Sequence, residues 1–153
     1  MIASKNEWGN TAWTFMHVLA SKVKLEDFHK QKEYIITIIR GICSNLPCPD
    51  CRSHAEKQMM RLNSGNISTK EDLIEMLRDF HNNVNIRTNK RVFSKVEMIK
   101  YEKVSTCDAV NVFFRTWYAG SSTPRLMMDT FARVRFLGWI RSYFDKNHQF
   151  YAP

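Results

Sequence analysis

Apolar residues recur every three or four positions along most of the chain, which is the spacing of one face of an α-helix. In the N-terminal segment this pattern predicts a helix from about Asn6 to Lys22. Its apolar stripe consists of Trp8, Ala12, Phe15, Met16 and Leu19. The isoleucine-rich run at 35–42 is too long and too irregular in its alternation for a strand, so it predicts a second helix. Asp27 is a candidate N-cap for that helix.

Prolines and capping residues divide the next part of the chain. Asn45-Leu46-Pro47 ends the second helix, because the residue before a proline disfavours the helical region. Pro49 suits the first turn of a third helix that runs to about Leu62. Ser68 and Glu71 have the spacing of a capping box and open a fourth helix that continues past residue 84.

The C-terminal third has a weaker pattern. A short helix is expected at Val96–Tyr101 and another at Cys107–Tyr118, and Thr123-Pro124 starts a last amphipathic segment. The apolar stripe of that segment includes Phe131, Val134, Leu137, Ile140 and Phe144. We therefore expect an all-α fold, with a four-helix bundle in residues 1–102 and a helical C-terminal extension in residues 103–153 that packs on the bundle or on a partner.

Composition adds little about fold but narrows the class of protein. Hydrophobic residues make up 44% and charged residues 25% of the chain, as in ordinary globular proteins. The net charge of +8 favours acidic partners or anionic ligands such as nucleotides, although solubility alone also explains it. No stretch approaches the ~18 apolar residues of a membrane span, and the N-terminus lacks signal-peptide features. We expect a cytoplasmic location and no membrane partner.

Two of the cysteines form the most informative unit of the chain. The four cysteines are Cys43, Cys48, Cys51 and Cys107. Cys48 and Cys51 enclose Pro-Asp at the expected start of a helix, where the macrodipole and the exposed N–H groups stabilise a thiolate. Such a pair is either redox-active or half of a zinc site, and His54 with His17 or His81 could complete four ligands. Because no second Cys-x-x-Cys exists, we favour the redox interpretation and expect no metal.

Polar residues interrupt two of the expected apolar stripes. Trp13 and His17 lie four residues apart on one helix face, and so do His81 and Asn85. Buried imidazoles and amides need hydrogen-bond partners, which a heteroaromatic ligand rich in nitrogen and carbonyl groups supplies. The basic residues at 87–91 suit a pyrophosphate, whereas the lack of a glycine-rich loop excludes a Rossmann-type nucleotide site.

Together these segments resemble the Erv/ALR family of FAD-linked sulfhydryl oxidases, and they are most like the forms encoded by large cytoplasmic DNA viruses. The family signature is Trp-Gly-x-x-x-Trp-x-x-x-His, then Cys-x-x-Cys, then His-Asn-x-Val-Asn with a following lysine and aromatic residue. The chain carries it in order as Trp8-Gly9, Trp13, His17, Cys48-Pro49-Asp50-Cys51, His81-Asn82, Val84-Asn85, Lys90 and Phe93.

The resemblance implies a helical bundle that cradles FAD, usually as a homodimer, and that oxidises protein dithiols or a small thiol carrier. Cys51 would be the flavin-proximal thiol and Cys48 the outer sulfur that exchanges with substrate, with electrons passing through flavin to O2 to give H2O2. The implied cofactor-binding residues are Trp8, Gly9, Trp13 and His17 around the rings, His81, Asn82 and Asn85 at adenine, ribose or ring edges, Val84 and Phe93 as packing groups, and Lys90 at phosphates or carbonyls.

The chain departs from cellular members of this family, which carry a second, shuttle cysteine pair and a structural bridge. Cys43 is expected to be an inert buried thiol. Cys107 is expected to be unpaired, ahead of a bridge to Cys43, a cross-link between subunits or an electron relay. The rival function is a zinc-stabilised helical module that binds nucleic acid through its positive charge; otherwise nucleic acid is not expected as a partner.

Overall fold

The computed structural model describes residues 3–118 and 127–153, and every regular element in these ranges is a helix. The longer helices are α1 (Lys5–Lys22), α2 (Phe28–Ser44), α3 (Pro49–Arg61), α4 (Lys70–Arg87), α5 (Thr106–Tyr118) and α6 (Met127–Asn147). The short 3-10 segments are η1 (Leu25–Asp27), η2 (Ser64–Asn66), η3 (Val96–Lys103) and η5 (His148–Phe150). The all-α prediction is confirmed, and none of the described helices is long and apolar enough to cross a membrane.

Two helix starts differ from the sequence-based prediction. The capping box of α4 is formed by Thr69 and Asp72, one residue later than the predicted pair Ser68 and Glu71. The shift arises because the carboxylate of Asp72 accepts from the backbone N–H groups of both Ser68 and Thr69 at 2.9 Å. Asp27 precedes α2 but caps nothing with its side chain, since η1 runs directly into α2 and leaves Asp27 in a helical conformation.

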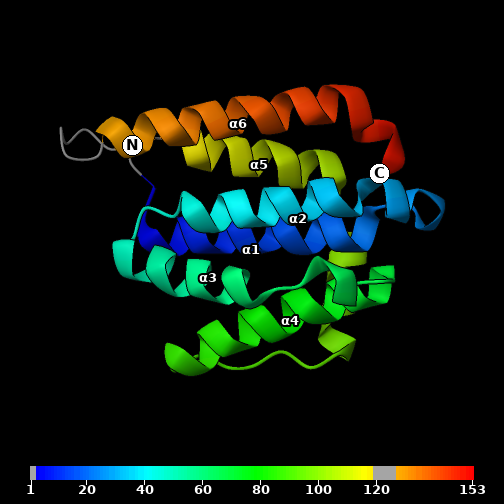
Figure 1. Ribbon diagram of the computed structural model, residues 1–153, viewed down its shortest axis with the longest axis horizontal. Coiled ribbons are helices and arrows are strands. Elements are labelled where there is room, and N and C mark those ends of the chain that lie inside the picture. The colour runs from blue at the N-terminus through cyan, green and yellow to red at the C-terminus, as the bar shows by residue number, and fades with distance from the viewer. Residues whose placement is uncertain (1–2, 119–126) are drawn as a thin grey trace.

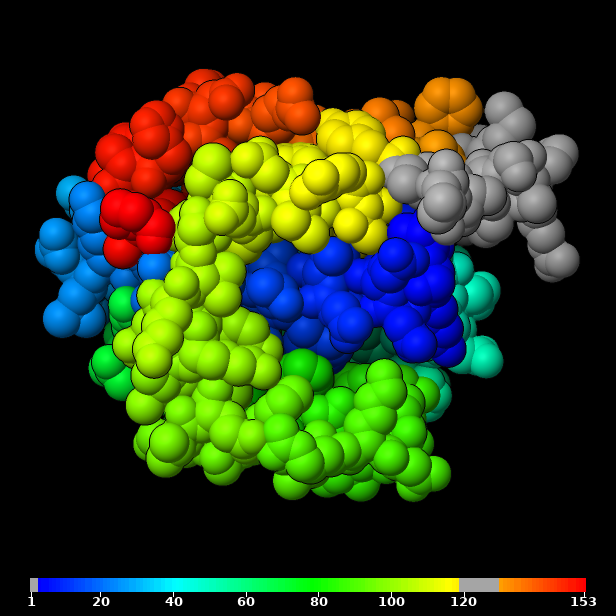
Figure 2. Space-filling model, turned by 180° about the vertical axis from the view of Figure 1, so that it is seen from behind, coloured from blue at the N-terminus to red at the C-terminus, as the bar shows by residue number. Residues whose placement is uncertain are grey.

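The helices are stacked in pairs, with α5 and α6 above α1 and α2, which in turn lie above α3 and α4 (Figure 1). Helix α1 is central, since it contacts α2, α4, α5 and η3. Seen from behind (Figure 2), a strip of α1 lies open between α4, η3 and α5. The central helix is therefore covered by its neighbours on most sides and exposed along this strip.

The segment 103–153 shares the hydrophobic core of the other helices. Phe113 and Trp117 of α5 and Leu137 and Ile140 of α6 are fully buried in the same cluster as the apolar faces of α1 and α2. Helix α6 approaches α2 closely at Gly41, because a Cβ at that position would collide with the ring of Phe136. The boundary proposed at residue 102 stays a prediction, but the core runs across it without a break.

Part of the predicted α6 stripe is wrong. The predicted start at Thr123-Pro124 lies outside the described residues. Phe131 is 65% exposed and Val134 is also exposed, whereas Leu137 is buried as predicted. The inward face of α6 is instead completed at its start by Arg133, whose Nε donates to the backbone carbonyl of Trp117 at 3.1 Å. A long polar side chain thus occupies a core-facing position that the apolar pattern could not reveal.

Candidate functional site

The cysteine pair lies at the N-terminus of α3. Cys48 is the N-cap residue in an extended conformation, and Pro49 occupies the first turn, as the sequence predicted. The Cys48 Sγ accepts a hydrogen bond from the backbone N–H of Cys51 at 3.3 Å. Both thiols are free and half-buried, and both line the same cavity. Local helix geometry alone therefore brings the two sulfurs together at the positive end of a helix dipole.

The two sulfurs differ in acidity. Burial acts to raise the pKa of Cys48, but hydrogen bonds from the side chain and backbone of Cys51 and the charge of Lys5 outweigh it, so the net pKa is lowered. Burial and then the neighbouring Cys48 sulfur raise the pKa of Cys51. Cys48 is therefore the more acidic thiol of the pair.

Lys5 is a site residue that the sequence reading missed. It lines the cavity together with Cys48 and Cys51, and the charges of Cys51 and then Cys48 raise the pKa of its ammonium group. The predicted helix began at Asn6 and so left Lys5 outside. The available signal was the capping box of α1, in which Ser4 and Glu7 hold each other's backbone N–H groups and make Lys5 the first helical residue.

The cavity has a volume of about 290 Å³ and lies between the first half of α1, the end of α2, the start of α3 and the end of α4. It brings together most of the residues predicted for the redox pair and the cofactor. These are Trp8, Gly9, Trp13, Cys48, Cys51, Val84 and Lys90. Indole rings and both sulfurs thus face one space, although the residues come from three separate helices and the turn that follows α4.

Both predicted histidines lie behind the Trp13 wall of this cavity. The His81 ring stacks on the Trp13 ring at a centroid distance of 4.0 Å and an interplanar angle of 5°. His17 Nε2 and His81 Nδ1 are 3.0 Å apart, close enough to share one hydrogen. The other face of this array is Tyr101, which stacks on His17 at 4.5 Å and which the sequence reading did not assign to the site.

Both histidines are held neutral. Burial, followed by the neighbouring His81 and Lys100, lowers the pKa of His17 to about 3. Burial, followed by Lys100 and Lys90, lowers the pKa of His81 to about 4. A neutral imidazole has one donor and one acceptor nitrogen, so the pair can offer its remaining ring nitrogens to a ligand.

Asn82, Asn85 and Phe93 lie beside the cavity and do not line it. The Asn82 side chain clamps the backbone of Phe93, accepting from its N–H at 2.8 Å and donating to its carbonyl at 2.9 Å. The Phe93 ring then meets the edge of His81 at 4.8 Å. Asn85 is buried, and among the described residues its side-chain amide has no hydrogen-bond partner, while its backbone carbonyl accepts from the Lys90 N–H at 2.7 Å.

These features fit a flavin dinucleotide. A Cβ added at Gly9 would meet none of the described heavy atoms within 4 Å, so this cavity wall is left open for a ligand. The volume suits a flat ring system, while the exposed Arg87 and Lys90 at the rim suit phosphates. The unpartnered amide of Asn85 offers both a donor and an acceptor, as the edge of a flavin or adenine ring requires.

The remaining cysteines stand apart from the pair. Cys43 is buried against the cavity, and burial raises the pKa of its thiol to about 12, so it is unreactive. Cys107 is exposed on α5, where Asn111 Nδ2 donates to its sulfur at 3.4 Å. Within the described ranges, no three His, Cys, Asp or Glu side chains come together as metal ligands, so the zinc alternative finds no ligand set there.

Comparison with known proteins agrees with this geometry. The Erv1 / Alr family matches residues 10–105, which is most of the chain. The chain belongs to this family. The resemblance drawn from the three signature segments is therefore confirmed, and the helical FAD-binding bundle is the fold of the family.

The relatives include plant and viral proteins. An FAD-linked sulfhydryl oxidase of Arabidopsis thaliana is 29% identical over 90 residues, which cover 59% of this chain and 47% of the plant protein. An FAD-linked sulfhydryl oxidase of African swine fever virus is 33% identical over 87 residues, covering 57% of this chain and 72% of the viral protein. A probable FAD-linked sulfhydryl oxidase of Acanthamoeba polyphaga mimivirus is 28% identical over 99 residues, which cover 63% of this chain and 69% of that protein. No solved structure matches the chain.

Proposed function

We propose that the chain is an FAD-dependent thiol oxidase that forms disulfide bonds in protein substrates, with Cys48 and Cys51 as its redox pair. The observation that carries this proposal is the shared cavity, in which both sulfurs and the rings of Trp8 and Trp13 face one space of about 290 Å³. A structural cysteine pair would not need a ligand-sized cavity beside it. Family membership supports the class of the reaction, and the cavity lining supports the choice of Cys48 and Cys51 as the redox pair.

The chemistry of the pair begins with thiol–disulfide exchange. One substrate thiolate attacks the Cys48 sulfur of the oxidised pair, so a mixed disulfide forms and Cys51 leaves as a thiolate. The second substrate thiolate then attacks the substrate sulfur of the mixed disulfide and releases Cys48. The lowered pKa of Cys48 favours this release, since a more acidic thiol is the better leaving group. The substrate gains a disulfide, and the enzyme pair holds two electrons and two protons.

The cofactor is proposed to lie beside the Cys51 side of the pair. When bound, FAD takes the two electrons from the reduced pair and passes them to O2, which yields H2O2. Trp8 and Trp13 would pack on its rings, the neutral His81 and the free amide of Asn85 would meet polar ring edges, and Lys90 would meet phosphates or carbonyls. His17 would hold His81 in place through their 3.0 Å contact.

We further propose that the enzyme acts in the cytoplasm (the host cytoplasm or the virion for a viral chain) and as a homodimer. Glutathione keeps thiols reduced in the cytoplasm, and an oxidase that passes electrons irreversibly to O2 overcomes that poise. An outward-facing apolar surface on α6, where Phe131 and Trp139 are exposed, is compatible with a subunit contact. Sedimentation equilibrium would give the assembly state directly.

Absorption and oxygen uptake test the proposed activity. Purified protein supplied with FAD should show bound flavin absorbance near about 450 nm and should consume O2 with dithiothreitol as substrate. Cys51→Ser should abolish oxygen uptake and keep the bound flavin, whereas Cys107→Ser should retain both. A protein that stays colourless after FAD is added, or a Cys51→Ser variant with full turnover, would show the proposal to be wrong.

A further inference from the structure

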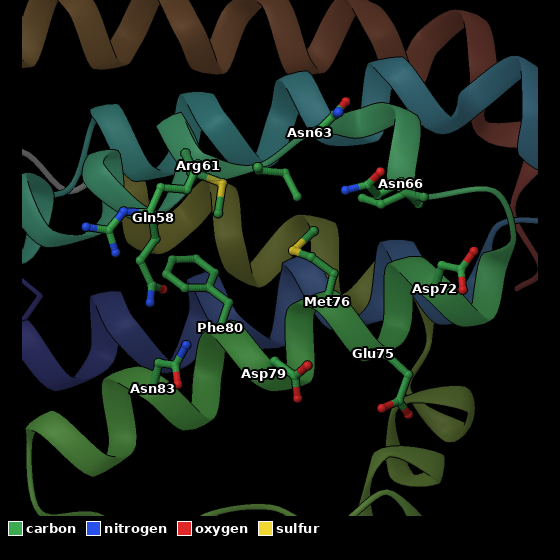
Figure 3. A pocket seen from close by; sticks show the side chains of 13 residues that line it. Gln58, Arg61, Asn63, Asn66, Asp72, Glu75, Met76, Asp79, Phe80 and Asn83 are labelled. Carbon is green, nitrogen blue, oxygen red and sulfur yellow. The ribbon is translucent and has the colours of Figure 1, made fainter.

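A second hollow, of about 560 Å³, lies between α3 and α4 (Figure 3). Its floor is apolar and its walls are polar. The floor is formed by Met59, Leu62, Ile67, Met76 and Phe80. The walls are formed by Gln58, Arg61, Asn63, Asn66, Asp72, Glu75, Asp79 and Asn83. We call this hollow the α3–α4 groove, and none of its walls belongs to the cofactor residues described above.

The α3–α4 groove continues directly from the redox cavity. Phe80 lines both spaces, so the two share one wall residue. On α3, Cys51 and Ala55 line the cavity, while Met59 lies one turn further along the same helix face and lines the groove. The two spaces therefore follow one another along the same helix pair, and a chain lying in the groove points towards the cysteines.

Charge distinguishes the groove from the rest of the molecule. Asp72, Glu75 and Asp79 follow one another along its α4 wall, and Arg61 is the basic residue among those that line it (Figure 3). Glu75 already pairs with Arg78 at 2.9 Å and with Lys95 at 3.6 Å, and Asp72 accepts from two backbone N–H groups, so Asp79 is the carboxylate of this wall with the weakest contacts. The chain as a whole carries a net charge of +8, so a wall with three carboxylates differs from its average surface. No set of three ligands for a metal ion is formed among the described residues, so these carboxylates do not form a cation site there.

One buried polar atom in the groove lacks a partner. The Gln58 Oε1 atom is inaccessible to solvent and has no hydrogen-bond partner among the described residues. Its side chain lies beside Phe80 and Asn83 in Figure 3. A buried acceptor without a donor costs free energy, and because Gln58 is itself only half-buried, a rotation of its side chain would bring this oxygen to an incoming N–H group. The amides of Asn63, Asn66 and Asn83 add donors and acceptors of the kind that an extended backbone uses.

We propose that the α3–α4 groove binds an extended, basic segment of the substrate polypeptide while the dithiol of that substrate exchanges at Cys48. This inference rests on the proposed function and adds a substrate preference to it. Along α3, the groove residues Gln58 to Leu62 lie about 15–21 Å from Cys48 at about 1.5 Å per residue. An extended peptide covers that distance in about four to six residues. The basic residues of a preferred substrate therefore lie about four to six positions from its cysteines.

Two synthetic peptides provide the test. Each carries one Cys-x-x-Cys dithiol and a run of three residues placed four positions away, lysine in one peptide and glutamate in the other. Oxygen uptake by the FAD-loaded enzyme should give a KM about fivefold lower for the lysine peptide, with similar kcat, because the groove acts in binding. Added salt should reduce the difference, since the groove is open to solvent.

Asp79→Lys tests the groove itself, because Asp79 is exposed and its ion-pair contact with Arg78 is a long one, at 3.6 Å. This variant should remove the preference for the lysine peptide. Asp79→Asn should halve the logarithm of the ratio between the KM values of the two peptides. Glu71→Lys is the matched control, since Glu71 is exposed on the same helix but does not line the groove. It should keep the preference.

Turnover of dithiothreitol distinguishes a failure of the docking inference from a failure of the proposed oxidase activity. This small dithiol does not reach the groove, so all variants should oxidise it at the wild-type rate. Equal KM values for the two peptides with normal dithiothreitol turnover would overturn the docking inference and leave the oxidase intact. A preference that survives Asp79→Lys, or is lost equally in Glu71→Lys, would also overturn it. No turnover of dithiothreitol by the wild type would overturn the proposed function and the docking inference together.

Discussion

Two faces of α1 carry aromatic residues, but one face packs against α5 and the other lines the cavity. On one face the Phe15 ring stacks on Phe113 of α5 at 4.2 Å, and both are fully buried. On the other face the Trp13 ring stacks on His81 of α4 at 4.0 Å and lines the cavity. Both contacts are aromatic stacks of ordinary geometry. The ring contacts alone therefore cannot distinguish packing from ligand binding.

The difference lies in what each face leaves unsatisfied. The α5 face consists mostly of carbon atoms that need only exclusion from water, with one buried indole N–H, that of Trp117, lacking a hydrogen-bond partner among the described residues. The α4 face buries the imidazoles of His17 and His81, whose pKa values of about 3 and about 4 show that their surroundings disfavour charge. A neutral imidazole still needs a donor and an acceptor as partners, and the 3.0 Å contact between the rings satisfies one nitrogen of each. The face beside the cavity therefore keeps more unsatisfied polar groups than the α5 face, where the Trp117 N–H is the one such group among the described residues.

Replacing Phe15 or Trp13 by alanine should separate the two faces most strongly. Phe15→Ala removes a fully buried ring against Phe113 and should lower the free energy of unfolding by about 3–5 kcal/mol. Trp13→Ala should cost less stability, because one side of its ring faces the cavity, but should weaken FAD binding. Urea unfolding and flavin titration measure the two effects.

Comparing the stability and the FAD affinity of these two variants shows whether each ring serves packing or ligand binding. Phe15→Leu keeps most of the buried volume and serves as a control that should restore most of the lost stability. If Trp13→Ala bound FAD as tightly as wild type, Trp13 would belong to the packing face. If Phe15→Ala were as stable as wild type, the α5 face would not be part of the core.

The pH dependence of stability should report the α4 face alone. Both histidine pKa values lie below the ordinary 6.5, so between that pH and about 4 the unfolded chain binds protons that the folded chain does not. Stability is therefore complete above pH 6.5 and falls as the pH drops. Each pKa unit corresponds to about 1.4 kcal/mol, so lowering the pH from 7 to 5 should cost about 2 kcal/mol per histidine.

A variant isolates one of these contributions. His81→Phe keeps an aromatic ring against Trp13 but cannot take up a proton, so the loss of stability between pH 7 and 5 should shrink by about 2 kcal/mol. His54→Phe, at an exposed position of α3, should leave the pH dependence unchanged. Equal pH profiles for wild type and His81→Phe would mean that His81 is not buried in a neutral form.

The sequence predicted the α4 face better than the α5 face. His17 and Asn85 were conspicuous because polar residues broke an apolar stripe, and that anomaly led to the ligand hypothesis. Phe113 and Trp117 gave no such signal, since an apolar helix face does not say which neighbour covers it. Placing α5 and α6 over α1 depends on tertiary contacts, including the close approach at Gly41, that no local spacing encodes.

Within the site, the sequence also failed where a residue acts through space. Cys48 and Cys51 were found because their spacing is local to one helix turn. Lys5 lies more than forty positions earlier in the chain, and only the packing of α1 against the start of α3 brings it to the sulfurs. Tyr101 reaches His17 in the same way, from η3. Site residues that lie far from a motif in the sequence cannot be predicted from the spacing of residues within that motif.

The smallest expected effect concerns Lys5, the charged residue at the cavity end of α1. Lys5→Met removes a positive charge that helps to lower the pKa of Cys48, so less thiolate should be present at neutral pH. In a Cys107→Ser background, iodoacetamide alkylation of the reduced protein at pH 7 should slow by about threefold, because a solvent-exposed charge acts weakly. Lys30→Met, at an exposed position of α2, should alkylate at the parent rate. If Lys5→Met also did so, the acidity of Cys48 would arise from the Cys51 hydrogen bonds and the helix N-terminus alone, and α1 would contribute rings but no charge to the redox pair.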